Sequence, residues 1–267
     1  MEKNAGSAGI YAKNNARKCC AGVAGMLQLS CTQKPASHDR QNGSKRCHGK
    51  GDFGMKVAMI GHKDFPSRSG GVEVMVGGLA VSMVRRGYEV TVYNRGLQKG
   101  HNVYTTEGVQ ARRIFTFQKA SLNAMVYSFL ATFDALTRDC DVIHYHAIGP
   151  SVPLVIAKLF GKHTVCTVHG LNWKVDKWGG FASAYLKLGE RVAAKYADDL
   201  VVLSESEWNY FQEKYDRTAI LIPNAVQMRQ PLPCNLIREK YGLEVGSYIL
   251  YVGRISPEKG PLDLVEG

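Results

Sequence analysis

The chain has 267 residues, 45% of them hydrophobic, and a formal net charge of +11. A chain of this length can bury a large core, and none of its apolar runs reaches the ~18 residues of a membrane-spanning helix. Residues 1–54 carry nine Lys/Arg and three Asp/Glu, a net +6, which leaves +5 for the other 213 residues. That remainder lacks the dense basic and aromatic patches typical of nucleic-acid binding, so we expect no nucleic-acid partner.

Residues 1–54 are rich in Gly, Ser, Asn, Lys and Ala and follow neither the strand nor the helix period. This composition predicts a disordered basic leader, or an extension misassigned to the frame ahead of Met55. Four of the seven cysteines lie in this segment, at spacings that match no common zinc finger. The other three are scattered along the chain, which favours a reducing, cytosolic compartment.

From Met55 onward, strand and helix patterns alternate. Strands are predicted at 57–61, 88–93, 109–115, 141–145, 164–168, 199–203 and 219–222, and helices at 72–86, 122–136, 152–160, 182–196, 205–215 and 236–241. Gly87 suits the end of the first helix, and Ser204 with Glu207 forms a capping box before the helix at 205–215. This alternation predicts an α/β fold, with a Rossmann-like doubly wound parallel sheet in a domain at 55–245. Ligands of such sheets bind at the carboxyl ends of the strands.

The last residues, 246–267, are expected to begin a second Rossmann-like domain that is truncated soon after its start. The apolar run at 248–252 is typical of a buried parallel strand, Gly253 permits a turn, and Pro261 suits the first position of a helix. Two cations, Arg254 and Lys259, lie between the turn and the helix. A phosphate-bearing ligand is therefore predicted at this loop and helix N-terminus.

Polar residues follow several of the predicted strands. Gly70 and Gly71 precede the helix at 72–86, where a ligand can approach the backbone N–H groups closely. His144 and His146 end one strand on the same face of the sheet. They could be metal ligands, but no third ligand is apparent nearby, so we favour a polar lining of a cleft. His169 follows the next strand and is a candidate for hydrogen bonding or proton transfer.

Five short motifs occur in order along the chain. They are Gly70-Gly71-Val72-Glu73, Thr167-Val168-His169-Gly170, Val201-Val202-Leu203-Ser204-Glu205-Ser206, Ile222-Pro223-Asn224-Ala225-Val226, and Gly253-Arg254 with Glu258-Lys259-Gly260. Together they resemble family 4 of the retaining nucleotide-sugar glycosyltransferases, over residues 55–267. The resemblance implies the GT-B fold, in which two Rossmann-like domains face each other.

The resemblance also implies roles for the donor-side residues. Gly70 and Gly71 would form the loop over the donor phosphates and the transferred sugar. The catalytic residue would be His169, beside that sugar and the acceptor hydroxyl, and Arg254 and Lys259 would bind the diphosphate. Two fixed cations can stabilise the leaving diphosphate without a metal ion, so we expect neither a metal nor another cofactor.

The acceptor side of the cleft is expected to include a second group of residues, with Asn224 marking the crossing between domains. The group is His144, His146, Trp173, Ser204 and Asn224. The implied reaction moves a sugar, as in a hexosyltransferase, from a nucleotide-diphosphate donor to a saccharide or lipid-linked acceptor with retention of configuration. Its setting would be the synthesis of cell-surface polysaccharide or glycolipid.

The family's nucleotide pocket and its pair of glutamates have no counterpart in the chain, so we expect residues 1–267 to be inactive alone. The first alternative is a non-catalytic truncated remnant that acts as a binding module. A related two-domain sugar epimerase is a further alternative, which the Arg254 and Lys259 motif disfavours.

Residues 172–196 hold five Lys/Arg against two acidic residues, with aromatic residues interleaved. Such a segment can dock on an anionic membrane surface, which would suit a lipid-linked acceptor. It can equally be a solvated helix with ordinary core aromatics. We expect a cytoplasmic protein and leave open a peripheral position at the inner face of the membrane.

Overall fold

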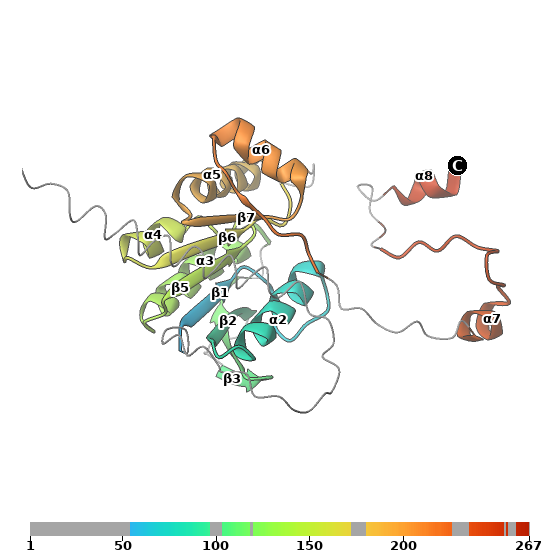
Figure 1. Cartoon of the computed structure of the whole chain (residues 1–267), viewed down its shortest axis with the longest axis horizontal. Helices are drawn as coiled ribbons and strands as arrows, with labels where there is room; N and C mark the ends of the chain where they lie inside the picture. The colour runs from blue at the N-terminus through green and yellow to red at the C-terminus, as the bar shows by residue number, and fades with distance from the viewer. Residues whose placement is uncertain are drawn as a thin grey trace, which may run out of the picture. The chain divides into compact units, whose positions relative to one another are not determined.

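The computed structural model describes residues 54–96, 103–117, 120–171, 180–225, 235–253, 255 and 260–266 (Figure 1). The chain divides into two compact units after Ala225. The stretch at 226–245, which the sequence analysis assigns to the first domain, falls in the second unit. Among the described helices, none is both long and apolar enough to cross a membrane.

The first unit is built on one eight-stranded sheet with the order β3-β4-β2-β1-β5-β6-β7-β8. The strands are β1 (Lys56–Ile60), β2 (Glu89–Gly96), β3 (Val103–Thr106), β4 (Val109–Phe115), β5 (Val142–His146), β6 (His163–Thr167), β7 (Asp199–Val202) and β8 (Ile220–Leu221). Every neighbouring pair is parallel except β3 with β4. The predicted Rossmann-like parallel sheet is therefore confirmed. The strand order reverses between β1 and β5, which makes their carboxyl ends the topological switch point where such sheets bind ligands.

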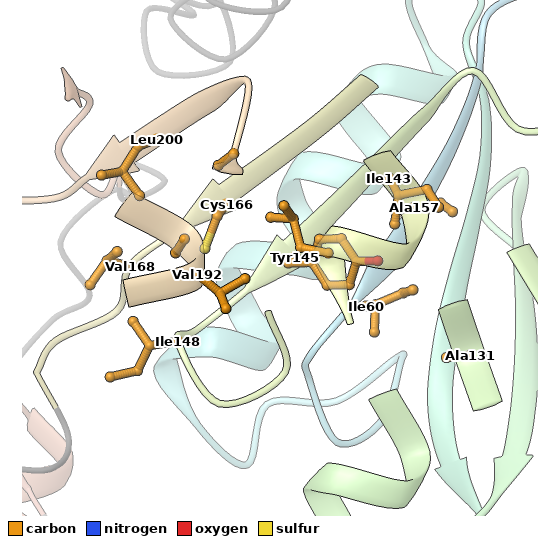
Figure 2. Close-up of a cluster of buried hydrophobic side chains, with 14 of the residues drawn as sticks. Ile60, Ala131, Ile143, Tyr145, Ile148, Ala157, Cys166, Val168, Val192 and Leu200 are labelled. Carbon is orange, nitrogen blue, oxygen red and sulfur yellow. The ribbon is translucent and has the colours of Figure 1, made fainter. Parts of the chain in front are cut away.

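Helices cover both faces of the sheet. They are α2 (Gly71–Val84), α3 (Ala120–Leu136), α4 (Leu154–Leu159), α5 (Gly180–Tyr196) and α6 (Glu205–Tyr215). Side chains alternate along β1, so that Val57 and Met59 pack with α2 while Ala58 and Ile60 pack with α3 to α6. Figure 2 shows the core on the second face, where Tyr145 of β5 lies among aliphatic side chains from neighbouring strands and helices.

The edge strand β3 is missing from the sequence-based prediction. It has only four residues, Val103–Thr106, and its side chains are exposed or half-buried, so it has no strong apolar alternation. It pairs antiparallel with β4 through the turn at Glu107 and Gly108, which both have positive φ, 51° and 80°. Positive φ at both central residues is the geometry of a tight hairpin, but Glu-Gly is not one of its usual sequence signals.

The start of α6 confirms the predicted capping box. The Ser204 hydroxyl accepts a hydrogen bond from the Glu207 backbone N–H at 3.3 Å. The Glu207 carboxylate accepts in return from the backbone N–H of Leu203 at 3.0 Å, one residue before the cap. These two bonds satisfy backbone donors that the helix itself leaves without partners.

In the second unit, α7 (Asn235–Tyr241) and α8 (Pro261–Glu266) are helical, and Pro261 begins α8 as predicted. The predicted strand at 248–252 is wrong. These residues have no strand structure, and Ile249 and Val252 are 84% and 83% exposed. A strand gains stability only beside a second strand and against a packed face, and the described part of this unit provides neither.

Candidate functional site

Four histidines gather at the carboxyl ends of the central strands. His62 follows β1, His144 and His146 lie in β5, and His169 follows β6. The rings of His144 and His146 have centroids 4.0 Å apart, as expected for two residues on one face of a strand. The ring of His146 then meets that of His169, with the Nδ1 of His146 3.3 Å from the Nε2 of His169. Three of these four residues, His144, His146 and His169, were predicted from the sequence, and the structure brings them together.

His62 is held on the other side of the cluster by β2. Its Nε2 lies 2.9 Å from the Oδ1 of Asn94, and both side chains are buried. The Nδ2 of Asn94 donates to the backbone carbonyl of Phe65 at 2.9 Å and to the hydroxyl of Tyr104 at 2.8 Å. The loop after β1 is thus tied to β2 and β3.

Gly61 allows β1 and β5 to approach each other at this point. Its φ is +133°, and a Cβ placed on it would lie 2.1 Å from the carbonyl oxygen of His146. Its N–H donates to the hydroxyl of Tyr127 at 3.1 Å, and its carbonyl accepts from Arg95 at 2.9 Å. The backbone at the switch point is therefore fixed by two side chains and closed to any residue larger than glycine.

Burial keeps all four rings neutral. It lowers the pKa of His62 to about 4, with the Arg95 guanidinium acting in the same direction and Asn94 and Glu73 opposing it. Burial also lowers the pKa of His144 to about 3 and that of His169 to about 4, although the Glu73 carboxylate acts to raise the latter. The pKa of His146 falls well below its ordinary value through burial and its three histidine neighbours. At neutral pH these rings act as hydrogen-bond donors and acceptors rather than as cations.

The glycine pair lies at the N-terminus of α2. Gly70 is the N-cap residue, and the space beside Gly71 is open, since a Cβ there would meet nothing within 4 Å. A Cβ on Gly70 would lie 2.4 Å from the Oε2 of Glu73. That carboxylate is buried, and its Oε1 accepts from the Lys63 backbone N–H at 3.2 Å. Glu73 therefore lies against the glycine loop, and its charge also acts to raise the pKa of His169.

The remaining predicted site residues are not part of this cluster. Ser204 uses its hydroxyl to cap α6, and Asn224 is exposed after β8. Trp173, Arg254 and Lys259 lie outside the described residues. Within the described ranges, no group of three or more His, Cys, Asp or Glu is arranged to hold a metal ion.

Four residues of the site were not predicted as site residues: His62, Glu73, Asn94 and Arg95. Glu73 was noted only as part of the glycine motif. His62 follows β1 in the same way that His169 follows β6, so the rule that identified His169 could have identified it. Asn94 and Arg95 directly follow the strand predicted at 88–93, so the same rule could have identified them, although β2 itself continues to Gly96.

Comparison with known proteins identifies the family. The model of the Glycosyltransferase Family 4 domain matches residues 69–230, more than half of the chain. A search of curated proteins found no match. Sucrose-phosphate synthase from Thermosynechococcus elongatus is similar in structure, with a TM-score of 0.64 and 19% identity over 79% of this chain and 59% of that one. An E. coli structure described as trehalose-6-phosphate bound with UDP-2-fluoro glucose aligns with a TM-score of 0.39 and 10% identity, over 59% of this chain and 42% of that one.

The likeness to the synthase concerns the fold, and this chain spans about 59% of that protein's length. The matched family domain includes the glycine pair, Glu73, His144, His146 and His169. The α/β sheet is the Rossmann-like sheet of GT-B glycosyltransferases. The chain belongs to glycosyltransferase family 4.

Proposed function

We propose that this chain contributes the acceptor-side domain of a retaining glycosyltransferase. Together with a complete donor-binding domain, it would move a sugar from a nucleotide-diphosphate donor to a saccharide or lipid-linked acceptor in the synthesis of cell-surface polysaccharide or glycolipid. The observation that carries the proposal is the cluster at the switch point, where the buried Glu73 carboxylate lies against the glycine loop of α2 and its charge acts on neutral His169. Membership of family 4 supports it.

The neutral state of His169 defines what it can do in this reaction. A ring with a pKa of about 4 is a weak base at neutral pH and carries no positive charge. It therefore suits the orientation of a sugar or acceptor hydroxyl by hydrogen bonding better than the stabilisation of the leaving diphosphate. That charge requires fixed cations, which supports the assignment of Arg254 and Lys259 to the diphosphate. In this proposal no metal ion is needed.

The exposed side of α5 is a candidate surface for contact with a membrane that carries the acceptor. Phe181, Leu188, Arg191 and Lys195 are exposed along this helix, at spacings that place them on one side. Apolar residues precede basic ones on this stripe, a composition that suits contact with an anionic lipid surface. We infer a peripheral contact with the inner face of the membrane, which would bring a lipid-linked acceptor to the cleft.

Flotation with liposomes tests this contact. The protein should rise with vesicles that contain anionic lipid, and the double variant R191E/K195E should not. The matched control K158E changes a cation that is paired with Asp198 at 2.6 Å near the start of β6. Wild-type protein that stays in solution with anionic vesicles would remove the membrane contact from the proposal.

Sugar transfer by an enzyme that contains this domain and a complete donor-binding domain tests the reaction itself. With a panel of nucleotide-diphosphate sugars and saccharide or lipid-linked acceptors, His169→Ala and Arg254→Ala should each lower kcat roughly 10²-fold, the usual effect of losing one preorganised hydrogen-bond or charge partner. The control Lys158→Ala removes a cation that pairs with Asp198 just before β7, at the amino ends of the strands and so at the opposite edge of the sheet from the histidine cluster, and it should leave the rate unchanged. Equal rates for all three variants would exclude the proposed site.

A further inference from the structure

His146 stands between the buried part of the histidine cluster and His169. It is fully buried, and its Nδ1 lies 3.3 Å from the Nε2 of His169. Its own Nε2 is buried and has no hydrogen-bond partner among the described residues. A neutral imidazole carries one N–H, so the contact between the two rings requires one nitrogen to donate and the other to accept.

The position of the proton on the neighbouring His62 follows from Asn94. The carbonyl of Phe65 can only accept, so the atom of Asn94 that faces it is the amide nitrogen, and the amide oxygen faces His62. The Nε2 of His62 therefore donates, and its Nδ1 is a bare acceptor. This Nδ1 is buried and also has no partner in the described part of the chain.

Two proton positions are open to His146. If its Nε2 carried the proton, this buried N–H would lack an acceptor. The bare Nδ1 of His62 is in the same cluster, but no hydrogen bond joins it to the Nε2 of His146. If its Nδ1 carries the proton, that N–H donates to His169 and only a bare acceptor remains without a partner. Orphaned buried N–H groups are rarer than under-satisfied acceptors, which favours the second arrangement.

We propose that His146 is a positioning residue, which donates its Nδ1–H to the Nε2 of His169 and thereby holds His169 in the Nδ1–H tautomer. His169 then has one ring donor, Nδ1–H, with which to bind an oxygen of the substrate. The importance of this tautomer for the reaction rests on the proposed function, but the hydrogen bond itself does not.

Nitrogen NMR of the 267-residue protein, labelled with ¹⁵N-histidine, tests the proposal. Correlations from the ring nitrogens to the carbon-bound ring protons distinguish a nitrogen that carries a proton from a bare one. The signals of His169 are those that disappear in His169→Gln. In the wild-type protein we expect Nδ1 of His169 to be protonated and Nε2 to be bare. The opposite assignment in the wild type overturns the proposal without the need for any variant.

Two substitutions at His146 separate the hydrogen bond from packing. His146→Asn can place an amide N–H near the position of Nδ1 and should keep the His169 tautomer. His146→Phe fills a similar volume without a donor, so the Nδ1 signal of His169 should move toward the bare-nitrogen range as the Nε2–H tautomer becomes populated. An unchanged tautomer in a folded His146→Phe protein overturns the proposal. If His169 has the Nδ1–H tautomer but no sugar transfer is found, the result counts against the proposed function and not against this hydrogen bond.

Discussion

Replacing Gly61 by alanine adds only one methyl group, yet it should lower the stability of this fold substantially. Gly61→Ala adds one methyl group at a backbone with φ of +133°, where it would meet the His146 carbonyl oxygen at 2.1 Å. The obstacle is backbone of a central strand, which cannot rotate away as a flexible side chain could. The carboxyl ends of β1 and β5 must therefore separate, and the Gly61 contacts with Tyr127 and Arg95 must stretch.

Two costs add up at this position. Overpacking a well-packed site costs roughly 1–3 kcal/mol, and a residue other than glycine in such a backbone conformation costs roughly 1–3 kcal/mol more. The free energy of unfolding should fall by roughly 2–6 kcal/mol, which is a large part of the 5–15 kcal/mol typical of a folded domain. At roughly 2–4 °C for each kcal/mol in a domain of this size, the Tm should drop by about 4–24 °C.

Urea and thermal unfolding followed by circular dichroism measure this change. Gly78→Ala is the matched control, because Gly78 lies inside α2 and a Cβ there would meet nothing within 4 Å. Alanine is the better helix former, so the control should raise stability by up to about 1 kcal/mol. If Gly61→Ala lost less than about 1 kcal/mol, or behaved like the control, the close approach of β1 and β5 would be refuted, since overpacking alone should cost that much.

Two further predictions follow from buried titratable side chains. Lowering the pH from 7 toward 4 should reduce the free energy of unfolding. His62 and His169 bind protons near pH 6.5 in the unfolded chain but only near pH 4 in the folded protein. Each ring should therefore contribute a loss of up to about 1.4 kcal/mol per pH unit. Urea unfolding at a series of pH values measures this, and a flat profile would contradict the burial of the rings. Glu190 is fully buried and accepts hydrogen bonds from Tyr210, Lys214 and Tyr215 at 2.8, 2.9 and 2.6 Å. Glu190→Gln should therefore lower the free energy of unfolding by roughly 1–3 kcal/mol. The control Glu213→Gln, at an exposed position on α6, should leave it almost unchanged. An equally small change for Glu190→Gln would show that its contacts with α6 do not stabilise the fold.

The sheet could be predicted because each parallel strand is a short apolar run followed by a helix with its own period and caps. The capping box at Ser204 even located the start of α6. The strand expected at 248–252 shows the limit of this reasoning. An apolar run indicates what a segment can do beside a partner strand, but it contains no information about whether that partner is present.

The candidate site was predictable as far as it depends on strand ends. His144, His146 and His169 were identified because the carboxyl ends of parallel strands meet at one edge of a sheet. The pairing of His62 with Asn94 joins residues 32 apart in sequence, and the contact of Gly61 with His146 depends on strand order. Neither has a local sequence signal, so both required the three-dimensional structure.

The most direct test of the central claim is the anomeric configuration of the product. An enzyme that contains this domain and a complete donor-binding domain would be given a donor sugar of known configuration, and the anomeric proton coupling of the transferred sugar would be read by NMR. We predict that the product keeps the configuration of the donor and that His169→Ala slows its formation. An inverted product, or a retained product formed at the wild-type rate by His169→Ala, would contradict the account.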